Sequence, residues 1–329
     1  MGRTHLAAYQ RAEADGLPCR VVAVSDRDPA RLTGKADPSG NINSGARDEQ
    51  LFDPSQVATF PDVDELLSSD AVQLVSVCTH TETHVDLAMR AMRAGKHVLV
   101  EKPVALTIEA VETLIREADR TGRICMPAMC MRFWPGWSWL KEQSASAAYG
   151  RIVSARFERL GAAPSWGGGF YSDFDRSGGA LFDLHVHDVD FVYHLFGQAS
   201  AVNTVGTLAH LTTTFACDSV PGQVVAEGGW LTSPSFPFRM RYVVEFERAV
   251  ADFDIARDSP LMVHTEHESR EVELSGLNGY DGEIRHAIDL VTGRADRPQA
   301  PLADALCVTR MILAERASLE AGHPVPVDA

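Results

Sequence analysis

The sequence predicts two domains: an α/β domain with a doubly wound parallel sheet, and an α+β domain with a largely antiparallel open sheet. Residues 1–128 alternate short apolar runs with helical patterns, which is typical of a parallel sheet covered by helices. Residues 129–329 place strand-like segments one after another through turns, which is typical of an antiparallel sheet with one covered face. A length of 329 residues also suits about two domains.

Local signals predict each element of the first domain. A helical pattern over residues 2–14 includes His5, Leu6 and Tyr9, and Gly16-Leu17-Pro18 ends it. Apolar runs predict strands at 20–25, 72–78, 97–100 and 123–129, and helices are expected at 28–32, 62–67, 83–94 and 107–122. Residues 35–50 are rich in Gly, Asn, Asp and Ser and are expected to form a surface loop.

The second domain has a different order of elements, in which strands follow one another with few helices between them. Strands are predicted at 151–160, 201–208, 223–231, 238–247 and 249–256, with a weaker pair within 262–274. Helices are predicted at 179–195, 282–292 and 302–321. An open sheet face usually needs a partner, so we expect a homo-oligomer, either a dimer or a tetramer.

Composition excludes several classes of function. The net charge of −15 and the lack of any basic run argue against a nucleic-acid binder. The six cysteines are scattered without a Cys-x-x-Cys pair, which favours a reducing compartment over a disulfide framework. No apolar stretch reaches the roughly 18 residues of a membrane span, and no signal peptide is recognised. We therefore expect a cytoplasmic protein that acts on a small molecule.

A charged pair ends the strand predicted at 97–100. Glu101 and Lys102 follow that apolar run, and Pro103 must stop the strand because it has no N–H for a sheet ladder. The two side chains therefore lie at the carboxyl end of a buried strand, which is where ligands bind in open α/β sheets. The alternative is an ordinary salt-bridged strand end.

A second polar group occurs in the segment 178–188. Asp183 and His187 are four residues apart, so on a helix they lie on one face about one turn apart. A carboxylate orients an imidazole and favours its protonated form, which suits a general base for an alcohol proton. The alternatives are a solvated helix face and a metal site. His185 and His187 point about 200° apart on a helix and cannot hold one ion, so no metal is predicted and His185 is expected to be structural.

These blocks resemble the Gfo/Idh/MocA oxidoreductases, the family of glucose–fructose oxidoreductase and inositol dehydrogenase. The first resembling block runs from Thr81 to His84 and from Ala94 to the Glu-Lys-Pro of 101–103. The second is similar to the family's Gly-Gly-x-x-x-Asp-x-x-x-His motif, at 178–188, and Gly279-Tyr280 and the last helix also fit. The resemblance implies a Rossmann-type first domain and an NAD(P)-dependent oxidoreductase. It would move a hydride between the nicotinamide and a secondary alcohol of a sugar, polyol or cyclitol.

The resemblance also implies roles for particular residues. His187 is expected to be the base, Asp183 its orienting partner and Lys102 the group that stabilises the alcohol oxygen. In the family the peptide before this proline, here Pro103, is often cis, and a cis bond would direct the Lys102 side chain into the cleft. Phe133 is expected in the core, while Arg132 is expected to reach the nicotinamide or substrate.

Cofactor choice depends on Asp26, which ends the strand at 20–25. A carboxylate there binds the ribose diol and repels a 2′-phosphate, so NAD is favoured over NADP, although the neighbouring Arg27 could stack on adenine or soften that repulsion. His80 departs from the proline common in the family, and a capping or packing role is also open for His84. The residues expected near the cofactor are Gly2, Arg3, Asp26, Arg27, Thr79, His80, His84, Glu101, Lys102 and Arg132.

The main departure from the family lies at the beginning of the sequence. A dinucleotide-binding sheet begins with a strand and a Gly-x-Gly-x-x-Gly turn, whereas here Gly2 matches only the third glycine. We expect the Rossmann domain to lack its first strand and two phosphate-facing glycines. One explanation is a true start upstream, with Met1 an internal methionine. The other is a chain that binds the cofactor poorly.

Two other functions remain open at this point. A non-catalytic cofactor-sensing or scaffolding protein would keep the fold, and the two absent glycines favour it. Such a protein would be expected to lose Lys102 or His187, and both are present. A metal-dependent lyase or hydrolase at the histidine-rich block would hold a tightly bound metal.

Overall fold

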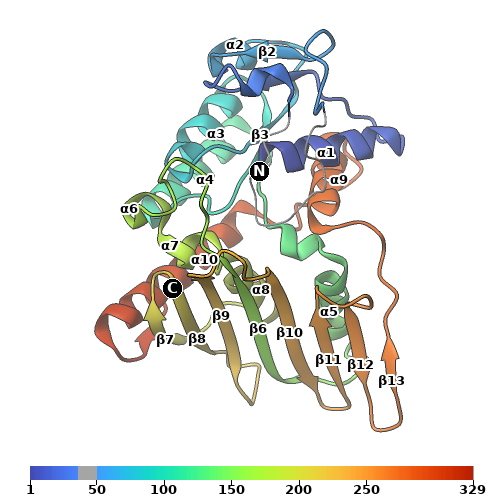
Figure 1. The fold of residues 1–329 in the computed structure, drawn as a ribbon, viewed down its shortest axis with the longest axis vertical. Coiled ribbons are helices and arrows are strands. Elements are labelled where there is room, and N and C mark those ends of the chain that lie inside the picture. Colours follow the sequence, from blue (N-terminus) through green and yellow to red (C-terminus); the bar gives the residue numbers. More distant parts are fainter. Residues whose placement is uncertain (36–49, 329) are drawn as a thin grey trace. The chain divides into compact units, whose positions relative to one another are not determined.

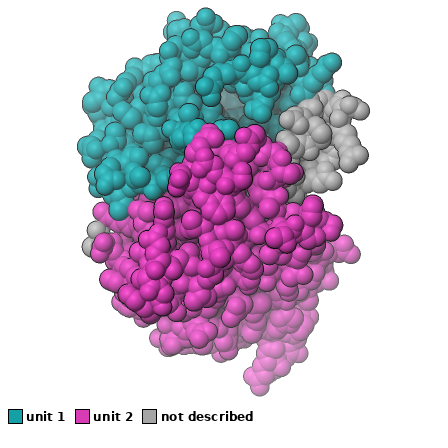
Figure 2. Space-filling view, turned by 60° about the vertical axis from the view of Figure 1, so that its left-hand side comes forward, with its two compact units in different colours: residues 1–128, 280–303 teal, residues 129–279, 304–329 magenta. Residues whose placement is uncertain are grey.

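The computed structural model describes residues 1–35 and 50–328, and the chain divides into two compact units (Figure 2). Unit 1 contains residues 1–128 and 280–303, and unit 2 contains residues 129–279 and 304–329. The first crossing between the units lies at the expected domain boundary, but residues 280–303 belong to unit 1 instead of the second domain. Contacts within unit 1 explain this, because Arg11 donates a hydrogen bond of 2.7 Å to Asp281.

Unit 1 contains the alternating helices and strands that the sequence predicts. Its elements are α1 (Gly2–Ala14), β1 (Ala23–Ser25), β2 (Ala58–Phe60), α2 (Val63–Leu67), β3 (Leu74–Val77), α3 (His84–Arg93), β4 (His97–Val100), α4 (Ile108–Thr121), β5 (Cys125–Pro127) and α9 (Gly279–Val291). The helix expected at 28–32 is a short 3-10 helix at Arg31–Thr33. The expected loop 35–50 lies outside the described residues except for its ends, where Lys35 and Gln50 form an antiparallel bridge.

The helix ends of unit 1 follow their local signals. Thr107 caps α4, where its hydroxyl oxygen accepts a hydrogen bond from the N–H of Ala110. Gly95 and Gly122 follow α3 and α4 with φ of +79° and +64°, a conformation that glycine adopts without strain. These caps set where β4 and β5 begin.

The parallel strands of unit 1 form two sheets among the described residues. Strand β1 pairs with β2, and the second sheet has the order β3-β4-β5; Figure 1 labels β2 and β3. Residues 98–100 of β4, the central strand of the second sheet, are fully buried, whereas the residues of β1 and most of those of β3 are half-buried. Strands β1 and β3 are therefore edge strands. Whether a further strand belongs beside them stays a prediction.

Unit 2 is built on one large sheet. Its strands are β6 (Ile152–Ala162), β7 (Ala201–Thr207), β8 (His210–Ala216), β9 (Val224–Leu231), β10 (Arg239–Phe246), β11 (Ala249–Asp254), β12 (Leu261–His264), β13 (Ser269–Glu271) and β14 (Val325–Pro326). Their order is β13-β12-β11-β10-β6-β9-β8-β7-β14. Only β6 and β9 pair in parallel within this sheet, so the prediction of a largely antiparallel sheet is confirmed.

Helices cover one face of this sheet. They are α5 (Pro135–Ser146), α6 (Phe174–Ser177), α7 (Gly179–Asp183), α8 (Val186–Phe196) and α10 (Leu302–Ala321). Trp137 of α5 lies at the centre of the core, with its ring 4.7 Å from that of Phe191 and 5.3 Å from that of Tyr242. On the other face Val243 and Val205 are exposed, so the sheet has the expected open side.

The single helix predicted at 179–195 is wrong, because α7 and α8 are separate helices. The break lies at Leu184 and His185, where the N–H of His185 donates to the carbonyl of Ala180, five residues earlier. His185 is fully buried against β9, and a Cβ on Gly228 would lie 2.6 Å from its Nδ1. The glycine leaves the space that lets this histidine turn inward, which interrupts the helix.

Within the described ranges, none of the helices is both long and apolar enough to cross a membrane.

Candidate functional site

In unit 1 the candidate site lies at the carboxyl end of β4. Residues 98–100 have no exposed surface, Glu101 is buried and Lys102 is half-buried. The Lys102–Pro103 peptide bond is cis, as the resemblance implied. Because β3, β4 and β5 are parallel, Thr79 and Lys102 lie at the same edge of the sheet.

Glu101 is held through both oxygens of its carboxylate. Its Oε1 lies 2.9 Å from Nε2 of His5, and its Oε2 accepts the backbone N–H of Lys102 at 3.1 Å. Burial favours the neutral acid, but the hydrogen bond and charge of His5, with the charge of Lys102, outweigh it and lower the pKa of Glu101. Glu101 is therefore a carboxylate at neutral pH, and the structure gives it contacts within the protein.

His84 connects two strand ends. Its Nδ1 lies 2.9 Å from the carbonyl oxygen of Pro103, and its Nε2 lies 3.0 Å from that of Thr79. Burial lowers the pKa of His84, and the two carbonyl groups oppose that shift. This position supports the packing role that the sequence left open, because the buried imidazole lies between the chain after β3 and the chain after β4 and donates its N–H to one of the two carbonyls.

The residues expected near a cofactor differ in exposure. Thr79, His80, Arg27 and Gly2 are exposed, and Arg3 is half-buried. The carboxylate of Asp26 accepts the N–H of Asp28 at 2.9 Å and lies 3.4 Å from the guanidinium of Arg31. Arg31 thus pairs with Asp26, and the roles suggested for Arg27, stacking on adenine or softening the repulsion of a 2′-phosphate, stay predictions.

In unit 2 the predicted base and its partner stand out by their exposure. Asp183 ends α7 and His187 lies in the first turn of α8, so the expectation that they share one face of a single helix is wrong. Both are half-buried, whereas every other residue from 177 to 192 is buried. Nδ1 of His187 lies 4.0 Å from Sγ of Cys130. Two polar side chains with solvent access in an otherwise closed segment can exchange protons with a ligand.

Buried ion pairs fix α8 just after His187, at Asp188 and Asp190. Arg159 donates two hydrogen bonds, of 2.9 and 3.0 Å, to the carboxylate of Asp188. Arg132 donates to Asp190 through Nε and Nη2, the latter at 2.6 Å, and to Asp304 through Nη1 at 2.6 Å. Arg132 is buried and has this structural role, so its expected contact with a cofactor stays a prediction.

His185 is a structural histidine, as expected. Its Nε2 lies 2.9 Å from Oε1 of Glu315, and both side chains are fully buried. Burial disfavours the charged imidazole, but the charge and hydrogen bond of Glu315 outweigh it and raise the pKa of His185. The role of His185 in joining α10 to the α7–α8 break excludes it from ligand binding.

A cavity of about 610 Å³ on unit 2 is separate from these residues. Trp134 and Phe253 line it together with the segments around β12 and β13, whereas Asp183 and His187 do not. Its size alone does not make it the chemical site, because the titratable residues with restricted exposure lie elsewhere.

The sequence reasoning missed His5, Glu283 and the arginine pairs. His5 was counted in the helical pattern of residues 2–14 without a role of its own, although a titratable residue on the buried side of α1 is itself a signal. Among the described residues, His5, Cys78 and Glu101 also offer ligand atoms within 4.8 Å of one another, a spacing that a metal ion could bridge.

Comparison with known proteins places these features in a family. A family model for the oxidoreductase family with an NAD-binding Rossmann fold, GFO_IDH_MocA, matches residues 1–129. A model for the GFO/IDH/MocA C-terminal domain matches residues 137–234.

Curated relatives and solved structures agree with these matches. An uncharacterized oxidoreductase of Rhizobium meliloti, ORF334, is 32% identical over 215 residues, which are 64% of this chain and 58% of the relative. Myo-inositol 2-dehydrogenase of Thermotoga maritima is 30% identical over 140 residues, 42% of this chain and 40% of the relative. The chain thus spans about half the length of the curated relatives it matches.

The fold is similar to that of levoglucosan dehydrogenase in complex with NADH and levoglucosan. That structure superposes with a TM-score of 0.81 at 18% identity, covering 100% of this chain and 97% of the other. The two family models match in the order that the motifs at 81–103 and 178–188 predicted, and together they span most of the chain. The chain belongs to the Gfo/Idh/MocA family, with an NAD-binding Rossmann domain followed by the family's C-terminal domain.

Proposed function

We propose that the protein is an NAD(P)-dependent oxidoreductase that moves a hydride between a nicotinamide and a secondary alcohol of a sugar, polyol or cyclitol. The observation that carries the proposal is the selective exposure of Asp183 and His187 within the closed segment 177–192. Family membership and the presence of Lys102 at the end of β4 support it. The relatives that act on inositol and levoglucosan suggest the substrate class.

The chain's own residues have separate tasks in this proposal. His187 accepts the hydroxyl proton of the alcohol, and Asp183 orients the imidazole. The ammonium of Lys102 stabilises the negative charge that develops on the alcohol oxygen as its proton leaves. A bound nicotinamide would supply the acceptor for the hydride on the carbon that carries the hydroxyl group, and that carbon would become the carbonyl carbon of a ketone.

The residues of unit 1 fit part of a dinucleotide. The N-terminus of α1 is exposed and is the positive end of the helix dipole, which favours a phosphate there. Asp26 offers a partly exposed carboxylate for the ribose diol, which favours NAD. Arg31 partly neutralises that carboxylate, so NADP is disfavoured less than Asp26 alone would predict.

The test has a binding step and a turnover step. We expect NADH fluorescence to change when the full chain is added, with weaker binding of NADPH. A screen of myo-inositol, scyllo-inositol, levoglucosan and related polyols with NAD should then show NADH formation. We expect Lys102→Met and His187→Ala to lower kcat by at least about 100-fold, because each removes a group that acts on the transition state.

Two variants serve as matched controls. Lys35→Met removes an exposed lysine of unit 1, and His267→Ala removes an exposed histidine of unit 2, so both should keep wild-type turnover. NADH binding without turnover of any polyol would instead support a cofactor-sensing protein. Turnover that survives in Lys102→Met and His187→Ala would show that the residue roles are wrong.

A further inference from the structure

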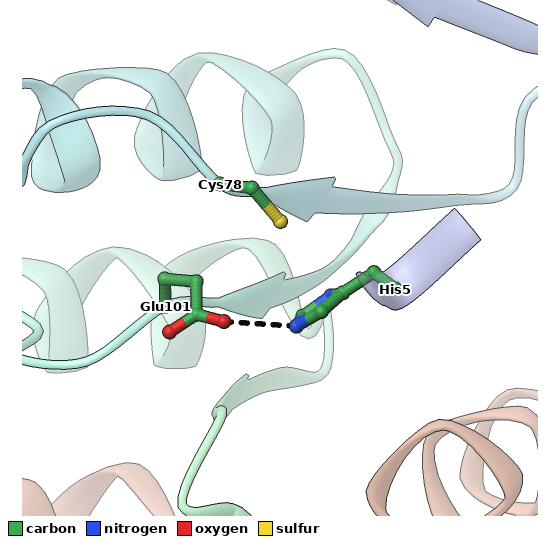
Figure 3. A group of neighbouring side chains, drawn as sticks. All are labelled: His5, Cys78 and Glu101. Atoms are coloured by element: carbon green, nitrogen blue, oxygen red, sulfur yellow. Dashed lines mark hydrogen bonds and ion pairs between the residues drawn. The ribbon is translucent and has the colours of Figure 1, made fainter. Parts of the chain in front are cut away.

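Four side chains from separate segments of unit 1 lie close together, next to the backbone of Lys102. His5 comes from α1, Cys78 follows β3, Glu101 follows β4 and Glu283 belongs to α9. Figure 3 shows His5 pointing toward Glu101, with Cys78 above the pair. His5, Glu101 and Glu283 are buried, so water does not solvate their charges.

The imidazole of His5 faces two carboxyl groups in this cluster, those of Glu101 and Glu283. Nε2 of His5 lies 2.9 Å from Glu101 and 3.5 Å from Oε1 of Glu283. Neither oxygen of Glu283 makes a hydrogen bond with the described residues. Burial and the charge of Glu101 raise the pKa of Glu283, although the charge of His5 opposes them. His5 and Glu101 therefore form the ion pair, and Glu283 is the neutral acid beside it.

The ion pair continues into the backbone of Lys102. The oxygen of Glu101 that does not face His5 accepts the N–H of Lys102 at 3.1 Å. Two consecutive hydrogen bonds thus connect α1 to the residue that precedes the cis peptide. The carbonyl of Pro103, on the other side of that peptide, is held by His84 at 2.9 Å.

We propose that His5 is a positioning residue for Lys102, acting through the carboxylate of Glu101. The inference rests on the proposed function, in which Lys102 stabilises the alcohol oxygen. Removing the His5 contact leaves one oxygen of Glu101 without its charged partner, so the carboxylate can turn and release the Lys102 N–H. Because His5 lies in the first turns of α1, the same contact links the proposed phosphate-binding helix end to Lys102.

The chain offers a direct readout of Lys102. It contains only four lysines, at positions 35, 96, 102 and 141. Reductive methylation with ¹³C-formaldehyde gives one dimethyl-lysine signal for each, and Lys102→Arg identifies the signal of Lys102. The signal reports the environment and the titration of the Lys102 ammonium without cofactor or substrate.

Three variants test the inference in the full chain. His5→Leu removes the donor and its charge, and Glu101→Gln keeps the shape but removes the carboxylate charge. We expect both to shift the Lys102 signal. Glu101→Gln should lower the pKa of Lys102, because a nearby negative charge favours the ammonium, whereas His5→Leu removes a positive charge and should raise it while Glu101 stays ionised. His5→Gln keeps an N–H donor, so it should restore most of the wild-type signal. In turnover, His5→Leu should lower kcat by about 10- to 100-fold with little change in KM.

His97→Gln is the matched control. His97 is a half-buried histidine at the opposite end of β4, where its Nδ1 accepts the N–H of Ile124. This variant should leave the Lys102 signal unchanged. If His5→Leu does not fold, Glu101→Gln and His5→Gln still decide the question, because both nearly preserve side-chain volume.

Two results would overturn the inference. One is a Lys102 signal that titrates as in the wild type in folded Glu101→Gln and in folded His5→Leu. The other is one equivalent of zinc, removed by a chelator and lost in Cys78→Ser, since His5 and Glu101 would then be metal ligands. A Lys102 signal that responds to His5 in a protein that oxidises no polyol would support the positioning but contradict the proposed function.

Discussion

The two units contain buried charges in opposite arrangements. In unit 2 each arginine meets carboxylates in a two-pronged geometry, as between Arg159 and Asp188 and between Arg132 and Asp190. In unit 1 a single imidazole, that of His5, faces both Glu101 and Glu283. Near α8 each of these arginines thus has one fully buried carboxylate, and the second partner of Arg132, Asp304, is partly exposed, whereas both carboxyl groups that face His5 are buried.

The two kinds of support respond to pH in different ways. An arginine stays charged at any pH at which a protein folds, so its pairs hold α8 as long as their carboxylates are ionised, although burial raises the pKa of Asp190. In unit 1 the charges of His5 and Glu101 cancel, so the group of His5, Glu101 and Glu283 is neutral overall only while Glu283 keeps its proton. The geometry at Lys102 therefore depends on the protonation of Glu283, whereas the arginine pairs of α8 require only that Asp188 and Asp190 stay ionised.

The largest expected effect is the loss of a buried ion pair. Arg132→Met leaves Asp190 buried without its cation, which should destabilise unit 2 by about 3–5 kcal/mol. All five tryptophans lie between residues 134 and 230, within unit 2, so tryptophan fluorescence during urea unfolding reports this unit.

The double variant Arg132→Met/Asp190→Leu is the control for this prediction. It removes both charges, so it should recover most of the lost stability. A single variant that costs less than about 1 kcal/mol would show that Arg132 does not support α8. Its predicted contact with a cofactor would then be the better explanation for its presence.

The buried carboxyl groups that face His5 in unit 1 predict a dependence on pH. Glu283 has a raised pKa in the folded protein, so above about pH 4.3 the unfolded chain releases a proton that the folded chain keeps. Its contribution to stability is complete below that pH and is lost as the pH rises toward the folded value. The free energy of unfolding should fall by about 1.4 kcal/mol for each pH unit in this window.

Glu283→Gln removes this dependence, because glutamine resembles the protonated acid and does not titrate. Circular dichroism during urea unfolding between about pH 5 and pH 8 should show a flatter profile for the variant. The tryptophan signal of unit 2 should not change, and Glu320→Gln, at an exposed site, should behave like the wild type. Equal slopes in wild type and Glu283→Gln would mean that Glu283 is ionised in the folded protein.

The sequence predicted the parts of the fold that strong local signals define. Strand β4 matches its predicted range because the glycine turn at 95 and Pro103 limit the apolar run on both sides. The family and the two-domain fold class were also predicted correctly, since the motifs at 81–103 and 178–188 occur in family order. Local signals of this kind do not depend on which residues pack together.

Features that depend on distant contacts were missed. The break between α7 and α8 arises because His185 packs against Gly228 and Glu315, which lie far away in the sequence. Strand β8 was missed because its threonine-rich sequence has too few apolar residues to indicate a strand. The His5–Glu101 contact spans 96 residues, so no local pattern could predict it, although Glu101 itself was identified.

The smallest expected effect on stability comes from an exposed ion pair. It tests whether an ion pair must be buried to contribute to the stability of a unit. Arg31 and Asp26 are partly exposed, so Arg31→Ala should leave the unfolding transition nearly unchanged. The variant should still increase the preference for NADH over NADPH by about two- to fivefold, because Asp26 then repels a 2′-phosphate with its full charge. Fluorescence titration with both cofactors measures the ratio, and Arg116→Ala, in an exposed pair on α4, is the control. An unchanged ratio would indicate that Asp26 does not contact the ribose. A large loss of stability would contradict the view that only buried ion pairs contribute strongly to the stability of each unit.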